Sequence, residues 1–120
     1  MRLLIAGSRN FNFDITAIQN FIDILIPMDT VIDEVVSGAC RGVDVSGQNW
    51  AEFQSYPVKK FKPDWDMHGK AAGPIRNRQM AEYADILLLV WDGKSKGSSN
   101  MRSEMAKLNK PIYEVILKQS

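Results

Sequence analysis

The sequence has 120 residues, of which 45% are hydrophobic and 24% charged, and we expect one domain over residues 1–120. A formal net charge of +1 excludes a globally basic surface for nucleic acid or membrane, so any anion site must be local. A single cysteine, Cys40, and a longest apolar run of strand length (86–91) predict a cytoplasmic protein without a membrane segment.

Apolar runs alternate with segments of helical periodicity along the chain. The apolar runs, each followed by a polar or glycine-bearing turn, are 3–7, 31–38, 56–63, 85–93 and 111–117. The segments with helical spacing between them are 14–26, 43–55, 74–83 and 98–108. Continuous apolar runs are typical of strands buried on both faces. The pattern predicts an α/β fold, a single Rossmann-like, doubly wound, mainly parallel five-stranded sheet with helices on both faces.

Several side chains are expected to build elements or core rather than to bind ligands. Asp14 is placed to cap the first helix. Trp50 and Trp91 are expected in the core, and Met101 and Met105 in the core or in a subunit contact. We expect so small a sheet domain to form a homo-oligomer.

Polar segments follow the first four predicted strands. In an open parallel sheet, ligands bind beyond the carboxyl ends of the strands, where the strand order reverses. The segments that reach this edge are rich in glycine, serine, arginine and lysine, and they are 7–14, 37–44, 63–78 and 91–100. Glycine lets backbone N–H groups approach a ligand, and serines and helix N-termini add donors. We therefore expect a phosphate-binding crevice, most simply for a nucleotide, although neither the P-loop nor the GxGxxG pattern occurs.

The segment GKAAGPIRNRQM (69–80) concentrates polar side chains at the start of one predicted helix. Proline is favoured in a first helical turn, so Pro74 predicts a helix start there, with Arg76 and Asn77 in the first turn. Arginines at this end oppose the helix dipole unless an anion or a carboxylate compensates them. A ligand anion is one such partner. The alternative partners are nearby carboxylates, namely Asp64, Asp66 and Glu82.

Other residues of the strand-end segments are further candidates for ligand binding or chemistry. Trp65 can stack on a base or pack against the protein, and Cys40 is interpreted as a small packing residue. His68 is the only histidine, so we expect no metal site, although Asp64 and Asp66 alternate with it. No cofactor is expected. No basic stripe stands out, so nucleic acid is not expected as a partner.

Four motifs carry a family resemblance. IAGSRNF, VVSGACRGVD, PDWDMHGKAAGPIRNRQM and WDGKSKGSSNM resemble the YspA/YpsA-related proteins of the SLOG superfamily, over about residues 3–115. That superfamily also includes LOG-type nucleotide phosphoribohydrolases and DNA-processing DprA/Smf proteins. The resemblance implies a nucleotide or nucleotide-derived ligand, of ADP-ribose type, in the crevice. With Trp65 added from its position, the implied ligand-binding residues are Gly7, Ser8, Arg9, Gly38, Arg41, Gly42, Asp44, Trp65, Arg76, Asn77, Gly93, Lys94, Ser95, Gly97 and Ser98.

The phosphate-side loop departs from that of the LOG enzymes. Their loop resembles PGGxGTxxE, whereas this chain has Gly97–Ser98 in place of Gly-Thr and Asn100, not a carboxylate, shortly after it. Without a well-placed carboxylate, cleavage of an N-glycosidic bond lacks its stabilising or activating group. We therefore predict a binding module, a sensor or sequestering protein for signalling. The alternative is a nucleotide phosphoribohydrolase or nucleosidase that uses one of three carboxylates, Asp44, Asp64 or Glu104.

Overall fold

Strands and helices alternate along the chain in the structure, a computed structural model that describes residues 1–118. The elements in chain order are β1 (Arg2–Gly7), α1 (Ile15–Leu25), β2 (Glu34–Ser37), α2 (Val43–Phe53), β3 (Val58–Lys60), α3 (Trp65–His68), the 3-10 helix η1 (Gly69–Ala71), α4 (Ala72–Tyr83), β4 (Ile86–Trp91), α5 (Lys96–Lys107) and β5 (Ile112–Ile116). The five strands pair in parallel in the order β3-β2-β1-β4-β5. The predicted Rossmann-like sheet is therefore confirmed.

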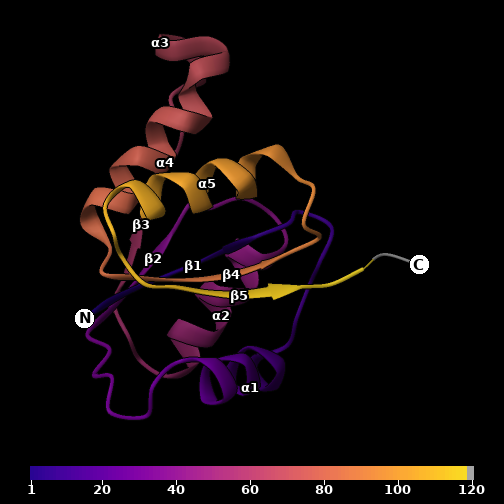
Figure 1. Cartoon of the computed structure of the whole chain (residues 1–120), viewed down its shortest axis with the longest axis vertical. Coiled ribbons are helices and arrows are strands. Elements are labelled where there is room, and N and C mark those ends of the chain that lie inside the picture. The colour runs from indigo at the N-terminus through magenta and orange to yellow at the C-terminus, as the bar shows by residue number, and fades with distance from the viewer. Residues whose placement is uncertain (119–120) are drawn as a thin grey trace.

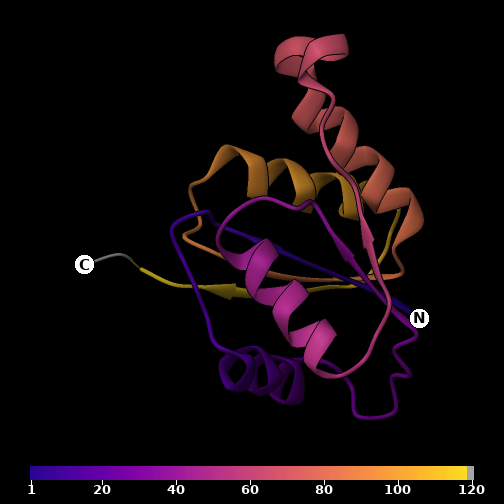
Figure 2. The same ribbon diagram turned by 180° about the vertical axis from the view of Figure 1, so that it is seen from behind.

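Helices cover both faces of this sheet. Figures 1 and 2 show α1 and α2 on one side of the strands, and α4 and α5 on the other. The buried hydrophobic side chains form two clusters. Trp50 of α2 packs in one of them, and Met101 and Met105 of α5 pack in the other. Because both faces are covered, β4 is buried along its whole length, Trp91 included. The predicted core positions of these four side chains are confirmed, and Asp14 caps α1 as predicted by accepting from the Ala17 N–H at 2.8 Å.

The strand order reverses between β1 and β4. From β1 the chain moves to β2 and β3 on one side, then crosses back to β4 and ends in β5 on the other side. The two neighbouring strands pair from Leu3 with Ile86 to Gly7 with Val90. Their following segments diverge onto opposite faces, so a crevice is expected beyond their carboxyl ends.

The helix that carries GKAAGPIRNRQM begins earlier than predicted. α4 starts at Ala72, and the short α3 and η1 precede it, so Pro74 is the third residue of its first turn. Proline is tolerated there because the first N–H groups of a helix have no partner within it. The prediction that Arg76 and Asn77 lie in the first turn was wrong, since both lie in the second. In Figures 1 and 2, α3 projects from the rest of the molecule beyond the start of α4.

Candidate functional site

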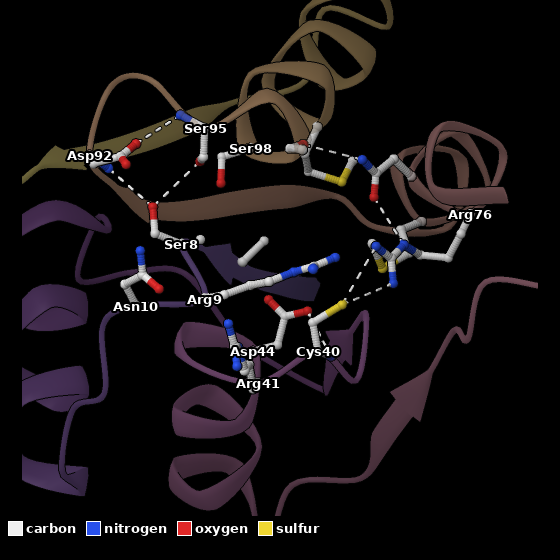
Figure 3. Close-up of a pocket in the computed structure, with 16 residues that line it drawn as sticks. Ser8, Arg9, Asn10, Cys40, Arg41, Asp44, Arg76, Asp92, Ser95 and Ser98 are labelled. Carbon is white, nitrogen blue, oxygen red and sulfur yellow. Dashed lines mark hydrogen bonds between the residues drawn. The ribbon is translucent and has the colours of Figure 1, made fainter. Parts of the chain in front are cut away.

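A cavity of about 330 Å³ opens beyond the carboxyl ends of β1 and β4, where the strand order reverses (Figure 3). Its walls come from the segments after β1, β2 and β4 and from α4 and α5. Small-molecule sites have volumes of about 300–1,000 Å³, so this cavity has room for a ligand of modest size. The predicted ligand-binding residues that line it are Gly7, Ser8, Arg9, Arg41, Asp44, Arg76, Asn77, Ser95, Gly97 and Ser98.

The N-terminus of α5 meets the cavity at Ser95, Gly97 and Ser98. Ser95 is the N-cap residue, but its side chain makes no capping hydrogen bond, and its carbonyl accepts only from the Ser99 N–H. The three N–H groups of the first turn, those of Lys96, Gly97 and Ser98, therefore have no acceptor within the helix. Ser98 is only 6% exposed, and its hydroxyl makes no hydrogen bond within residues 1–118. Free donors at the positive end of a helix dipole form an anion-binding arrangement.

Asp92 shapes the loop that leads into α5. Its Oδ1 accepts hydrogen bonds of 2.8 Å from the backbone N–H groups of both Lys94 and Ser95. These bonds, that of Lys94 foremost, hold the pKa of Asp92 below its ordinary value, so its carboxylate is ionised near neutral pH. Gly93 and Lys94, predicted for the phosphate-side loop, do not line the cavity. The loop closes on its own carboxylate, and Asp92 and the α5 end are the parts of this segment that line the cavity.

Ser8 joins three segments at this edge of the sheet. Its Oγ accepts from the Asp92 N–H at 3.2 Å and lies 3.5 Å from the Ser95 Oγ (Figure 3). Its carbonyl accepts from the Val43 N–H at the start of α2, at 3.3 Å. Gly42 has a φ of +84°, and a Cβ there would lie 2.5 Å from the Ser8 carbonyl oxygen. Gly42 thus shapes the site without lining it, because only glycine permits this close approach.

Arg76 of α4 lies against the loop after β2. Its Nη1 donates to the Gly38 carbonyl at 2.7 Å, and its Nε donates to the Asn77 Oδ1 at 3.0 Å. Its two Nη atoms also lie 3.8 and 3.9 Å from the Cys40 Sγ. Arg76 is 9% exposed, yet in the described part of the chain no carboxylate oxygen lies within 4.0 Å of its guanidinium. A buried charge without an ion pair gains from an anionic group in the cavity.

Asp44, in the first turn of α2, is buried beside this guanidinium and lines the cavity. Its Oδ2 accepts from the Cys40 N–H at 3.2 Å. Burial raises the pKa of Asp44 from 3.8 to about 6, opposed by the N–H groups of Cys40 and Gly7 and by the charges of Arg76 and Arg9. A Cβ at Gly38 would lie 2.8 Å from both the Arg76 Nη1 and the Asp44 Oδ2. Gly38 therefore makes room for both charged groups, although it does not line the cavity itself.

Comparison of the sequence with known proteins shows the family of this chain. The sequence model of the YspA, cpYpsA-related SLOG family matches residues 1–68. The chain belongs to this family. It is also 33% identical over 119 residues to the Gene 61 protein of Mycobacterium phage D29, covering 92% of this chain and 93% of that protein. No solved structure matches the chain.

Membership of the SLOG family indicates a nucleotide-related function. The matched residues 1–68 include the cavity segments after β1 and β2 and end before GKAAGPIRNRQM. The walls contributed by α4 and α5 therefore lie beyond the family match, and their assignment to the site rests on the geometry given above.

Two further predicted residues of this SLOG protein lie on the projecting α3 and away from the cavity. Trp65 is 53% exposed and is absent from the cavity lining. Asp64 caps α3 by accepting from the Met67 N–H at 3.0 Å. The unpredicted α3 is the physical reason, because it carries both side chains outward instead of leaving them in a loop over the site.

Glu104 of α5 is buried and does not line the cavity. Its carboxylate accepts from the Lys107 Nζ at 3.1 Å and from the Arg78 Nε at 3.5 Å. The Lys107 hydrogen bond holds its pKa below the ordinary value. Of the three carboxylates considered for catalysis, only Asp44 lines the cavity. Arg78 thus pairs with Glu104 rather than with any of the carboxylates predicted as partners for the helix arginines.

Six residues line the cavity that we did not predict for the site, namely Ala6, Asn10, Cys40, Met80, Asp92 and Met101. Asn10, Cys40 and Asp92 lie within the strand-end segments, so their position in the sequence already indicated that they could reach the site. Met101 was predicted for the core, where it is 2% exposed at the edge of the cavity. The site is thus a polar crevice with an apolar floor.

Residues 1–118 contain neither a metal-binding cluster nor a membrane-spanning helix. No group of three histidine, cysteine, aspartate or glutamate side chains there is arranged to hold a metal ion. In the same residues, no helix combines the length and the apolar character needed to cross a membrane.

Proposed function

We propose that this protein binds a phosphate-bearing, nucleotide-type ligand in the cavity and acts as a sensor or sequestering module. The observation that carries the proposal is the uncapped N-terminus of α5, together with Ser98 beside it, which lines the cavity and whose hydroxyl makes no hydrogen bond within residues 1–118. A phosphate oxygen placed there would accept from backbone N–H groups and from a hydroxyl that otherwise has no partner. The location at the reversal of strand order supports the same assignment.

The charges around the cavity also favour an anion. Three arginines line it, Arg9, Arg41 and Arg76, against two carboxylates, Asp44 and Asp92. The Asp92 Oδ1 already accepts from two backbone N–H groups. Arg9 and Arg41 are exposed side chains, so they can reach a ligand at the mouth, whereas Arg76 is held in the wall. An ADP-ribose type molecule has the phosphates and sugars that this lining suits.

Calorimetric titration tests the proposal with AMP, ADP and ADP-ribose as probes and adenosine as the phosphate-free control. We expect the phosphorylated probes to bind and adenosine to bind far more weakly. Ser98→Ala should weaken binding of AMP roughly tenfold to a hundredfold, since a hydrogen bond to a charged group contributes about 1.5–3 kcal/mol. Ser99→Ala, one residue along on an exposed position of α5, is the matched control. Folded protein that binds none of the probes would overturn the proposal, as would Ser98→Ala with unchanged affinity.

A nucleotide phosphoribohydrolase is the second candidate, and Asp44 is the observation that favours it. A carboxyl group with a pKa of about 6 in the cavity can act as a general acid or base near neutral pH. Incubation with AMP followed by chromatography would detect free adenine, and Asp44→Asn should abolish its release. The absence of free base with wild-type protein would reject this candidate and leave the binding function in place.

A cytoplasmic location and self-association belong to the same proposal. Cell fractionation tests the first, and light scattering during size-exclusion chromatography tests the second. A protein that elutes as a monomer at all concentrations would contradict the expected homo-oligomer.

A further inference from the structure

The carboxylate of Asp44 has acceptor capacity that the protein does not use. It is 6% exposed and accepts from the Cys40 N–H at Oδ2, and the backbone N–H of Gly7 is a second donor to it. A carboxylate has about four lone-pair sites, so about half of them remain for a ligand. A ligand that supplies donors can use the acceptor sites that remain, because Asp44 lines the cavity.

The surroundings of Asp44 restrict what such a ligand can place there. Its own negative charge repels a phosphate, and the guanidinium groups of Arg9, Arg41 and Arg76 around the same cavity repel a cation. The group next to Asp44 should therefore be neutral and rich in donors. Hydroxyl groups and amides meet both conditions.

The lining favours sugar hydroxyls over a nucleobase. None of the residues that line the cavity is aromatic, so no aromatic ring is present there for a base to stack on. Two adjacent hydroxyls match the two oxygens of one carboxylate, as in other bidentate contacts. Figure 3 shows Asp44 on the wall opposite Ser95 and Ser98, so the two ends of a ligand would meet different chemistry.

We infer that Asp44 recognises the vicinal hydroxyls of a phosphorylated ribose whose phosphate lies at the N-terminus of α5, and so selects ribonucleotides over deoxyribonucleotides. This inference rests on the proposed function, since it needs the phosphate at α5 to orient the sugar. It gives Asp44 a role as the specificity-determining residue of the site. Guanidinium groups of the cavity supply donors to the remaining sugar oxygens.

The test compares AMP with 2′-deoxyAMP by calorimetric titration of the full chain near neutral pH. We expect wild-type protein to bind AMP at least about tenfold more tightly, because a site built for a hydroxyl leaves buried polar groups unpaired when the hydroxyl is missing. Asp44→Asn should bring the two affinities within about twofold, chiefly by weakening AMP. Asp66→Asn removes an equal charge from an exposed position outside the cavity and should leave the preference intact.

Each outcome separates the two proposals. Equal affinities of wild-type protein for AMP and 2′-deoxyAMP would overturn the role of Asp44 and leave phosphate binding in place. An Asp44→Asn variant that keeps the wild-type preference would do the same. If neither nucleotide binds to folded wild-type protein, the proposed function fails and the inference fails with it. The wild-type comparison needs no variant, so the inference can be tested even if the substitution disturbs the fold.

Discussion

Arg76 donates a 2.7 Å hydrogen bond from its Nη1 atom to the carbonyl oxygen of Gly38, and this contact fastens α4 to the loop after β2. The two residues are 38 positions apart in the chain, and of the two Arg76 lines the cavity. Arg76 therefore has two roles, since it holds a wall in place and presents a charge to the same space. The polar side chains of GKAAGPIRNRQM therefore have a structural role besides the ligand contact that we propose.

Arg76→Ala should lower the free energy of unfolding by about 1–3 kcal/mol, because the buried Gly38 carbonyl would lose its donor. Urea denaturation followed by circular dichroism measures the change. Arg78→Ala is the matched control on the same helix, since its side chain is 69% exposed and its ion pair should contribute less than about 1 kcal/mol. Equal losses in the two variants would show that the Gly38 contact does not stabilise the fold.

Asp44→Asn should stabilise the protein at neutral and alkaline pH. The pKa of Asp44 is raised from 3.8 to about 6 by burial, so the folded protein holds its proton more tightly than the unfolded chain. The contribution of the protonated Asp44 to the free energy of unfolding is full below about pH 4. It is lost as the pH rises through about 6, and the loss is about 3 kcal/mol in all. The variant lacks this loss, so its advantage should be absent near pH 4, grow between about pH 4 and pH 6, and be complete above about pH 6.

Urea midpoints of both proteins across this pH range measure the difference. Glu104 and the other carboxylates titrate in both proteins, so their effects cancel in the comparison. An advantage that does not change with pH would show that Asp44 titrates normally. A carboxylate kept at a cost to stability is typical of a binding site.

The sheet could be predicted from the sequence because its signals are local. LLIA and ILLLVW are apolar without interruption, which happens when both faces of a strand are covered, and β1 and β4 are buried as expected. The reversal rule then placed the strand-end segments together. Ser8, Asp44 and Ser98 meet at the cavity for this reason.

The start of α4 and the path of the α3 segment could not be predicted in the same way. Pro74 is allowed at several positions of a first turn, so it does not define where a helix begins. The cap that starts α3 at Asp64 depends on a backbone conformation that no periodicity signals. This difference of a few residues removed Trp65 from the cavity and moved Arg76 into the second turn of α4.

Glu104→Gln should weaken the packing of α5 against α4 without changing the affinity for AMP. The Glu104 carboxylate pairs with Lys107 and Arg78, whose side chains are 68% and 69% exposed, so the loss should be roughly 1 kcal/mol. Because the pKa of Glu104 is lowered in the folded state, its contribution is present above the ordinary pKa of 4.5 and is lost as the pH falls below it. The wild-type advantage in urea should therefore fade in acid. A large fall in AMP affinity would contradict this and show that Glu104 belongs to the binding site.

The fluorescence of Trp65 should report on α3 and should not change when a ligand binds. Trp50 and Trp91 are 2% and 7% exposed, so acrylamide should quench chiefly the fluorescence of Trp65, which is 53% exposed. Trp65→Phe should remove most of the quenching and change the AMP affinity by less than about twofold, because the side chain lies outside the cavity lining. Saturating AMP should likewise leave the quenching of wild-type protein unchanged. Protection of Trp65 by AMP would mean that α3 folds over the bound nucleotide, and the tryptophan would then belong to the site as its sequence position first predicted.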